Sequence, residues 1–187
     1  MRKSNFLSAV IFLVSGGIVF AQDATDQKPV KEILAGHSSH GEAFNEGPRQ
    51  AAYLMPGTGT VRFPTTTTDP KAEQFVEQGV GQLHGFWFFE AERSFRQAAM
   101  IDPECAIAYW GMAMANQVNE DRAKGFISEA VKRIDQASER EQQYIHALNA
   151  YLDADPEKKK KRAQDYTKAL ERIIYEYPED IEAKAFL

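Results

Sequence analysis

The sequence contains a single cysteine, Cys105, so the chain cannot form an internal disulfide bond. No histidine is adjacent to Cys105, which follows a Pro-Glu turn, and this context favours a packing role over a catalytic thiol. Basic residues are also scarce, since 22 Lys and Arg face 27 Asp and Glu, for a formal net charge of −5. Because phosphate binding needs a concentrated basic face, this balance argues against a nucleic-acid partner.

Short motifs that carry chemistry are also missing from the sequence. It contains no HExxH zinc motif, no CxxCH haem site, no GxSxG nucleophile elbow and no phosphate-binding glycine loop. No stretch after residue 21 is apolar enough to span a membrane. These absences argue against the common classes of enzyme that such motifs identify.

Residues 1–21 have the layout of a secretory signal peptide. Arg2 and Lys3 precede an uncharged, mostly apolar stretch, and small residues end it at Ala21. The alternative is a retained membrane anchor, but the apolar run is shorter than the roughly 20 residues of a bilayer span, and Gly16-Gly17 weakens a long helix. We expect cleavage after Ala21 and a periplasmic or secreted protein. Loss of the two cations takes the net charge from −5 to −7.

Residues 22–70 are expected to form an irregular extension that lies over the following helices, because they carry Gly, Pro, Ser, Thr and Asn with few periodic apolar positions. Within this extension, His37 and His40 are three positions apart, and Glu42 follows. Imidazole with carboxylate suits a divalent metal ion such as zinc, with Glu46 as another possible oxygen ligand. The other interpretations are that these residues attach the segment to the helices by hydrogen bonds, or that the segment has no fixed structure.

From residue 71 onward, apolar and small residues recur with the spacing of short helix pairs. In the first unit, residues 71–104, small residues allow two helices to approach closely, phenylalanines fill the space beside them, and a proline ends the second helix. The positions that carry this pattern are Phe75, Gly79, Ala91, Phe95, Ala98 and Pro103.

Further units are expected at residues 105–138 and 139–180, with the start of another at 181–187. Tyr109 and Ala113 repeat the first-helix positions, and Pro178 repeats the helix end. In the second unit, the pattern predicts a helix over residues 121–137. The sequence stops inside the expected helix at 181–187, whereas a helical array normally ends on a polar cap, so we interpret the chain as a fragment of a longer protein or as the product of a truncated reading frame.

These units resemble the tetratricopeptide repeat (TPR) family over residues 71–187. The resemblance implies an all-α fold, a right-handed superhelical solenoid of antiparallel helix pairs whose first helices line a concave face. Gln78 departs from the family pattern, which usually has a large apolar residue at that position.

In the TPR family, the concave face binds peptides or segments of partner proteins. Carried over by position, the residues that would face such a partner are Val76, Val80, His84, Trp110, Met114 and Gln117. For Trp110 and Met114 the alternative is packing against the next repeat. The resemblance implies an exported scaffold for an unidentified protein or peptide, without a cofactor. The second hypothesis is a metal-binding protein, or part of a metal-dependent enzyme, that uses His37, His40 and Glu42 docked on the helices.

Overall fold

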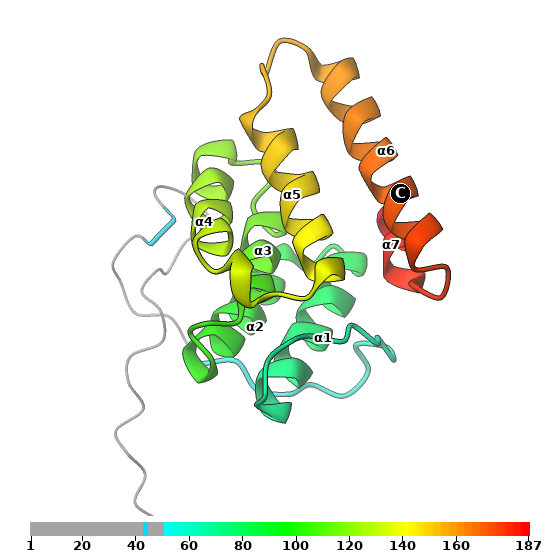
Figure 1. The fold of residues 1–187 in the computed structure, drawn as a ribbon. Coiled ribbons are helices and arrows are strands. Elements are labelled where there is room, and N and C mark those ends of the chain that lie inside the picture. The colour runs from blue at the N-terminus through cyan, green and yellow to red at the C-terminus, as the bar shows by residue number, and fades with distance from the viewer. Residues whose placement is uncertain (1–42, 45–50) are drawn as a thin grey trace, which may run out of the picture. The chain divides into compact units, whose positions relative to one another are not determined.

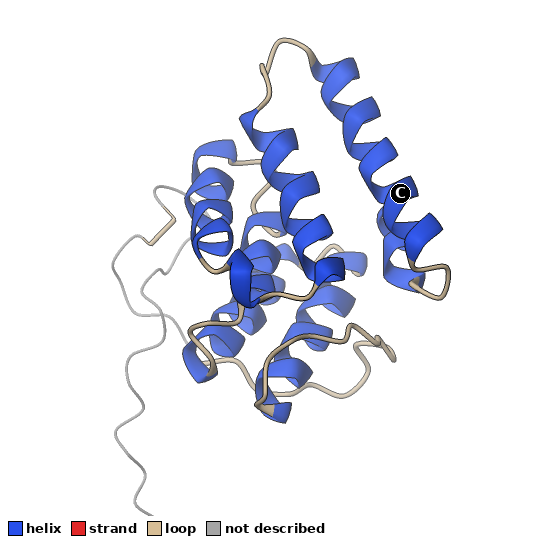
Figure 2. Cartoon of the chain, in the orientation of Figure 1, coloured by secondary structure: helices blue, strands red, loops and turns tan. Residues whose placement is uncertain are grey.

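Helices are the only regular secondary structure in the part of the chain that the structure, a computed structural model, describes, namely residues 43–44 and 51–187 (Figures 1 and 2). These residues belong to one structural unit, residues 31–187. The predicted all-α class is confirmed for them, whereas the predicted signal peptide lies outside the described residues. The helices are α1 (Pro70–His84), α2 (Phe88–Ile101), α3 (Ala106–Met114), α4 (Glu120–Lys132), α5 (Glu139–Asp153), α6 (Lys159–Glu176) and α7 (Ile181–Phe186), with a short 3-10 turn, η1 (Ile134–Gln136).

Side chains at the helix ends explain several of these boundaries. Asp69 accepts hydrogen bonds from the backbone amides of the first turn of α1, and Pro70 occupies the first helical position, where no amide is needed. Ser138 and Glu141 form a reciprocal capping box at the start of α5. Pro103 and Pro178 follow the ends of α2 and α6, as the sequence pattern predicts.

The predicted helix over residues 121–137 is shorter in the structure. Helix α4 ends at Lys132, and the chain continues into η1. The amide of Arg133 binds the carbonyl of Ala130, and the amide of Ala137 binds that of Ile134, so the hydrogen bonds shift to the tighter i−3 spacing. Apolar spacing alone cannot separate these two kinds of turn.

Each helix packs against the next one along the chain, and α3 also contacts both α1 and α5. The ring of Phe95 on α2 lies against two glycines, Gly79 on α1 and Gly111 on α3. A Cβ atom at Gly79 would lie 2.7 Å from this ring, and one at Gly111 would lie 2.3 Å from it. Both helices therefore approach α2 at a distance that only glycine permits. Within the described residues, none of the helices has the length and apolar character needed to cross a membrane.

Candidate functional site

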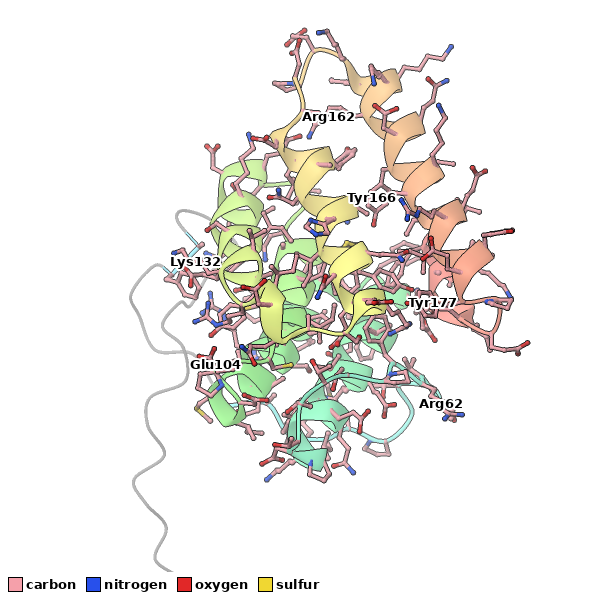
Figure 3. All side chains as sticks on the ribbon, in the orientation of Figure 1. Arg62, Glu104, Lys132, Arg162, Tyr166 and Tyr177 are labelled. Carbon is pink, nitrogen blue, oxygen red and sulfur yellow. The ribbon has the colours of Figure 1, made fainter. Side chains whose placement is uncertain are left out.

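A segment of the chain, residues 53–67, lies against α1, α3 and α5, and we call it the strap. It turns at residues 56–58 and runs on as an extended chain from Val61. From Val61 to Asp69, residues that are at least partly buried alternate with exposed ones, which is the two-residue period of an extended chain. Phe63 is fully buried in this pattern, while its neighbours Arg62 and Pro64 are exposed. Figure 3 shows the side chain of Arg62 at the edge of the molecule. The helices thus hold the strap as they would hold a bound peptide.

The deepest contact of the strap is an aromatic pocket around Phe63, whose side chain is 0 % exposed. Its ring is stacked on Trp110 of α3 at a centroid distance of 5.6 Å and an interplanar angle of 14°. Tyr144 of α5 lies 5.2 Å from the same ring. The guanidinium of Arg140 covers it at 4.3 Å, within the range of a cation–π contact. Two helices therefore contribute specific contacts to one side chain of the strap.

The side chain of Gln78 on α1 both accepts a hydrogen bond from the backbone of the strap and donates one to it. Its Oε1 accepts a hydrogen bond from the amide of Met55 at 2.6 Å, and its Nε2 donates to the carbonyl of Tyr53 at 3.0 Å. Ser94 on α2 accepts a second bond from the same Nε2 and donates to Gln82, which holds the amide in place. Because the amide pairs with main-chain groups, this contact recognises an extended backbone and places no demand on the side chains of the strap.

Carboxylates on α1 and α5 also accept hydrogen bonds from amides of the strap. Glu73 and Glu77 are one helical turn apart, and they accept from Thr65 at 3.4 Å and from Phe63 at 3.3 Å. Glu141 on α5 accepts from the amide of Thr66 at 3.1 Å. The same face thus offers acceptors at the spacing of an extended main chain.

Close approach of the strap to α1 depends on a glycine. A Cβ atom at Gly81 would lie 2.6 Å from the carbonyl oxygen of Thr58, which is closer than a carbon and an oxygen can approach. At its far end, the strap is attached to α2 by a hydrogen bond of 2.6 Å from the hydroxyl of Thr67 to Asp102. The contacts therefore run along the whole strap.

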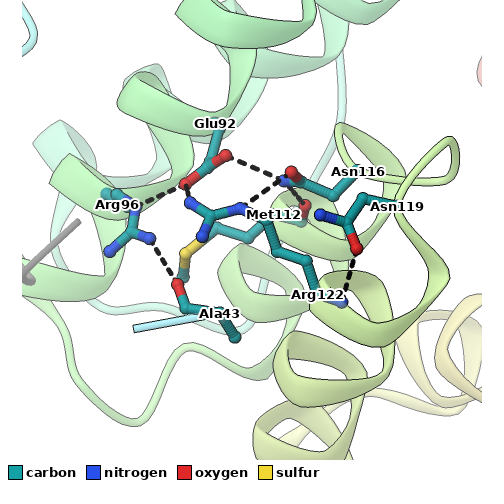
Figure 4. A network of polar contacts seen from close by, with 7 residues as sticks. All are labelled: Ala43, Glu92, Arg96, Met112, Asn116, Asn119 and Arg122. Carbon is teal, nitrogen blue, oxygen red and sulfur yellow. Dashed lines mark hydrogen bonds and ion pairs between the residues drawn. The ribbon is translucent and has the colours of Figure 1, made fainter. Parts of the chain in front are cut away.

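A buried polar network binds the backbone at Ala43, which precedes the strap in the sequence (Figure 4). Glu92 Oε1 accepts from Arg96 Nε at 2.7 Å and from Arg122 Nη2 at 2.6 Å, and Asn116 donates to the other oxygen. Arg96 in turn donates from Nη2 to the carbonyl of Ala43 at 2.8 Å. Both guanidiniums are fully buried. The negative charge of the carboxylate between them offsets the cost of removing their positive charges from water.

Helix α7 borders the same face and carries a second set of polar contacts. Asp180 Oδ2 accepts from Arg140 at 2.7 Å and from the hydroxyl of Tyr144 at 2.9 Å. Burial alone would raise the pKa of the Asp180 carboxyl, but hydrogen bonds from Arg140 and a backbone amide outweigh it, so this pKa lies below its ordinary value. The ionised carboxylate thereby fixes two residues, Arg140 and Tyr144, that contact Phe63.

The residues predicted to face a partner lie mostly in the interior. Val76, Val80 and Trp110 are fully buried, Met114 is nearly so, and Gln117 is exposed. Besides Phe63, Trp110 contacts Tyr144 of α5 and Phe186 of α7, so it has the packing role considered as the alternative in the sequence. Contact of these residues with a separate partner stays a prediction.

Two further polar residues of that predicted set have partners inside the chain. His84 Nε2 lies 2.5 Å from Glu182 Oε2 on α7, and its ring packs against Phe186. The amide of Gln117 lies 3.2 Å from the sulfur of Met114. His84 therefore links α1 to α7 in this structure.

The predicted metal ligands His37, His40 and Glu42 lie outside the described residues, so the structure says nothing about them. Among the described residues, no group of three or more His, Cys, Asp or Glu side chains is arranged to hold a metal ion. Cys105 is buried, and burial raises the pKa of its thiol to about 12. A protonated thiol is the opposite of what a nucleophilic cysteine requires.

Reasoning from the sequence missed the residues that hold the strap. Gln78 was noted only as a departure from the repeat pattern, yet a polar residue at a buried position was a usable signal for a backbone contact. The alternation from Val61 to Thr65 was a second signal, since it predicts an extended segment with Phe63 turned inward. Neither signal identifies the helices that the segment contacts.

No family model, curated protein or solved structure matches this chain.

Proposed function

We propose that this chain is a TPR-type binding scaffold whose α1–α3–α5 face binds an extended polypeptide, and that the strap is the occupant of this face within the chain. The observation that carries the proposal is the two-way contact of Gln78 with the main chain of Tyr53 and Met55. A buried amide that pairs with two backbone groups is suited to recognising a strand whatever its sequence. The pocket at Phe63 adds selectivity for an aromatic residue eight positions after Met55.

The repeat character of the fold is part of this proposal. Consecutive helices pack on one another, and among the first helices of the expected units, α3 contacts both α1 and α5. That pattern is expected for stacked helix pairs in which each unit buries the apolar face of its neighbour. The glycine contacts of Phe95 with α1 and α3 support it, since they place a second helix between two first helices.

Export of the protein is a further part of the proposal and rests on residues 1–21. The cationic start, the apolar stretch and the small residues before Gln22 support a signal peptide that is removed after Ala21. N-terminal sequencing of the protein recovered from the periplasm or the medium tests this. A mature chain that still begins at Met1 would contradict the cleavage.

A peptide of residues 53–67, labelled with a fluorophore, tests binding in trans. In the natural chain the strap competes from within, at an effective concentration that reaches the millimolar range for short tethers. The Phe63→Leu variant weakens this internal competitor, because leucine does not provide the aromatic contacts with Trp110 and Tyr144. We expect the natural peptide to bind the Phe63→Leu chain at least about tenfold more tightly than the natural chain, as measured by fluorescence anisotropy.

Two controls separate groove binding from nonspecific adhesion. A peptide that carries Phe63→Ala should lose most of its affinity for the Phe63→Leu chain. Adding Gln78→Leu to the Phe63→Leu chain should weaken binding of the natural peptide by roughly tenfold, since two backbone groups lose their partner. If circular dichroism shows a folded chain and the natural peptide still binds both chains equally, or neither, the proposed function is wrong.

A further inference from the structure

A cavity of about 410 Å³ lies between α5 and α6, away from the strap, and we call it the slot. Its volume falls in the range of small-molecule sites. The slot exists because small residues line it on both sides: Ala147 and Ala150 on α5, Ala154 directly after α5, and Ala169 on α6. Alanine side chains are too short to fill the space that larger apolar residues would occupy.

Aromatic rings complete the apolar lining of the slot. Tyr151 of α5 and Tyr166 of α6 contact each other at a centroid distance of 5.6 Å. The hydroxyl oxygen of Tyr166 lies 3.7 Å from the sulfur of Met114. The ring of Tyr166 is the part of this side chain that we assign to the lining of the slot. Figure 3 shows Tyr166 and Arg162 on the side of α6 that faces α5.

Arg162 supplies the slot with a buried cation whose hydrogen bonds are incomplete. The residue is only 4 % exposed. Its Nε donates to the carbonyl of Tyr151 at 2.9 Å, and its Nη1 lies 3.0 Å from Glu120 Oε1. Among the described residues, its Nη2 has no hydrogen-bond partner. A buried guanidinium N–H without an acceptor costs free energy, so an acceptor that enters the slot would be stabilised there.

The lining of the slot carries one more cation than carboxylate. Arg172 and Arg162 face a single lining carboxylate, Asp165, and His146 is also part of the lining. The carboxylate of Asp165 is paired with exposed Lys161, and the guanidinium of Arg172 with Glu176. The unpartnered donor therefore belongs to a cation, and the preferred acceptor is a negatively charged oxygen.

We propose that the slot binds a small carboxylic acid with an apolar tail, with its carboxylate at Arg162 and its tail along the alanines. A carboxylate is a strong acceptor for the guanidinium N–H at Nη2, which has no partner among the described residues. The slot runs along α6 between Arg162 and Arg172, whose α-carbons are about 15 Å apart on an ideal helix. A linear tail of medium length fits this distance.

Octanoate is the probe, and isothermal titration on the unsubstituted chain is the measurement. We expect octanoate to bind, while acetate, which lacks the tail, and octan-1-ol, which lacks the charge, bind at least about tenfold more weakly. The Arg162→Met variant should bind octanoate and octan-1-ol equally, whereas Ala150→Leu, which fills the slot, should bind neither. Loss of the discrimination between octanoate and octan-1-ol is a readout that a purely structural role of Arg162 would not produce.

Tyr175→Ser is the matched control, because Tyr175 lies on α6 outside the slot with 87 % of its surface exposed. It should bind octanoate like the natural chain. Thermal melts of each variant establish that the chain is folded, and Ala150→Leu keeps the test decisive if Arg162→Met does not fold. Equal binding of octanoate and octan-1-ol by the natural chain, or unchanged octanoate binding by a folded Ala150→Leu chain, would overturn the proposal.

Discussion

Replacing Phe63 by alanine is expected to lower the free energy of unfolding by about 3–5 kcal/mol, the usual loss when a buried phenylalanine is truncated. The side chain is fully buried, and it contacts Trp110, Tyr144 and the guanidinium of Arg140. Truncation leaves a cavity between α3 and α5 that the helices can fill only by moving together. Denaturant unfolding followed by circular dichroism measures the effect.

Tyr53→Ala is the matched control for this prediction. Tyr53 is also an aromatic residue of the strap, but 67 % of it is exposed and its bond to Gln78 uses the backbone carbonyl. We expect its replacement to change the free energy of unfolding by no more than about 0.5 kcal/mol. Equal effects of Phe63→Ala and Tyr53→Ala would mean that the aromatic pocket does not hold the strap in solution.

Replacing Glu92 by glutamine is expected to cost about 3–5 kcal/mol, although the two side chains have nearly the same shape. Glu92 is the carboxylate between Arg96 and Arg122, and both guanidiniums are buried. A neutral amide can still accept one hydrogen bond, but it cannot compensate two positive charges that are shielded from water. The large expected effect therefore comes from charge alone, and urea unfolding of the two chains measures it.

Glu90→Gln provides the comparison on the same helix. Glu90 forms an ion pair with Arg93 at 3.3 Å, but its side chain is 35 % exposed. Pairs near solvent contribute little, so the expected change is within about 0.5 kcal/mol. If Glu92→Gln were no more destabilising than Glu90→Gln, the charge of Glu92 would not be what compensates the burial of the two arginines.

The sequence predicted the helices well because their signals are local. Spacing of apolar residues, the prolines that follow α2 and α6, and the small residues at Gly79 and Ala91 all act within one or two turns. The single clear error, the helix end near Lys132, concerns a change from α to 3-10 hydrogen bonds that no side-chain pattern marks.

The candidate site was harder to predict because its contacts join distant parts of the chain. Thr66 and Glu141 are 75 residues apart, and nothing in the sequence pairs them. Val80 was assigned to the concave face by its position in the repeat, and for Trp110 packing was one of two interpretations. Both residues are buried in the structure. Only a packed fold shows that upstream chain already covers that face.

The order along the chain of Phe63 and the residues that its ring contacts has a consequence for folding. Phe63 is synthesised first, and its binding pocket is incomplete until Trp110 and Tyr144 have both been synthesised. Contacts across such separations form late, after the loop between them has closed. During synthesis, the side chain of Phe63 is therefore exposed and accessible to chaperones until α5 is complete.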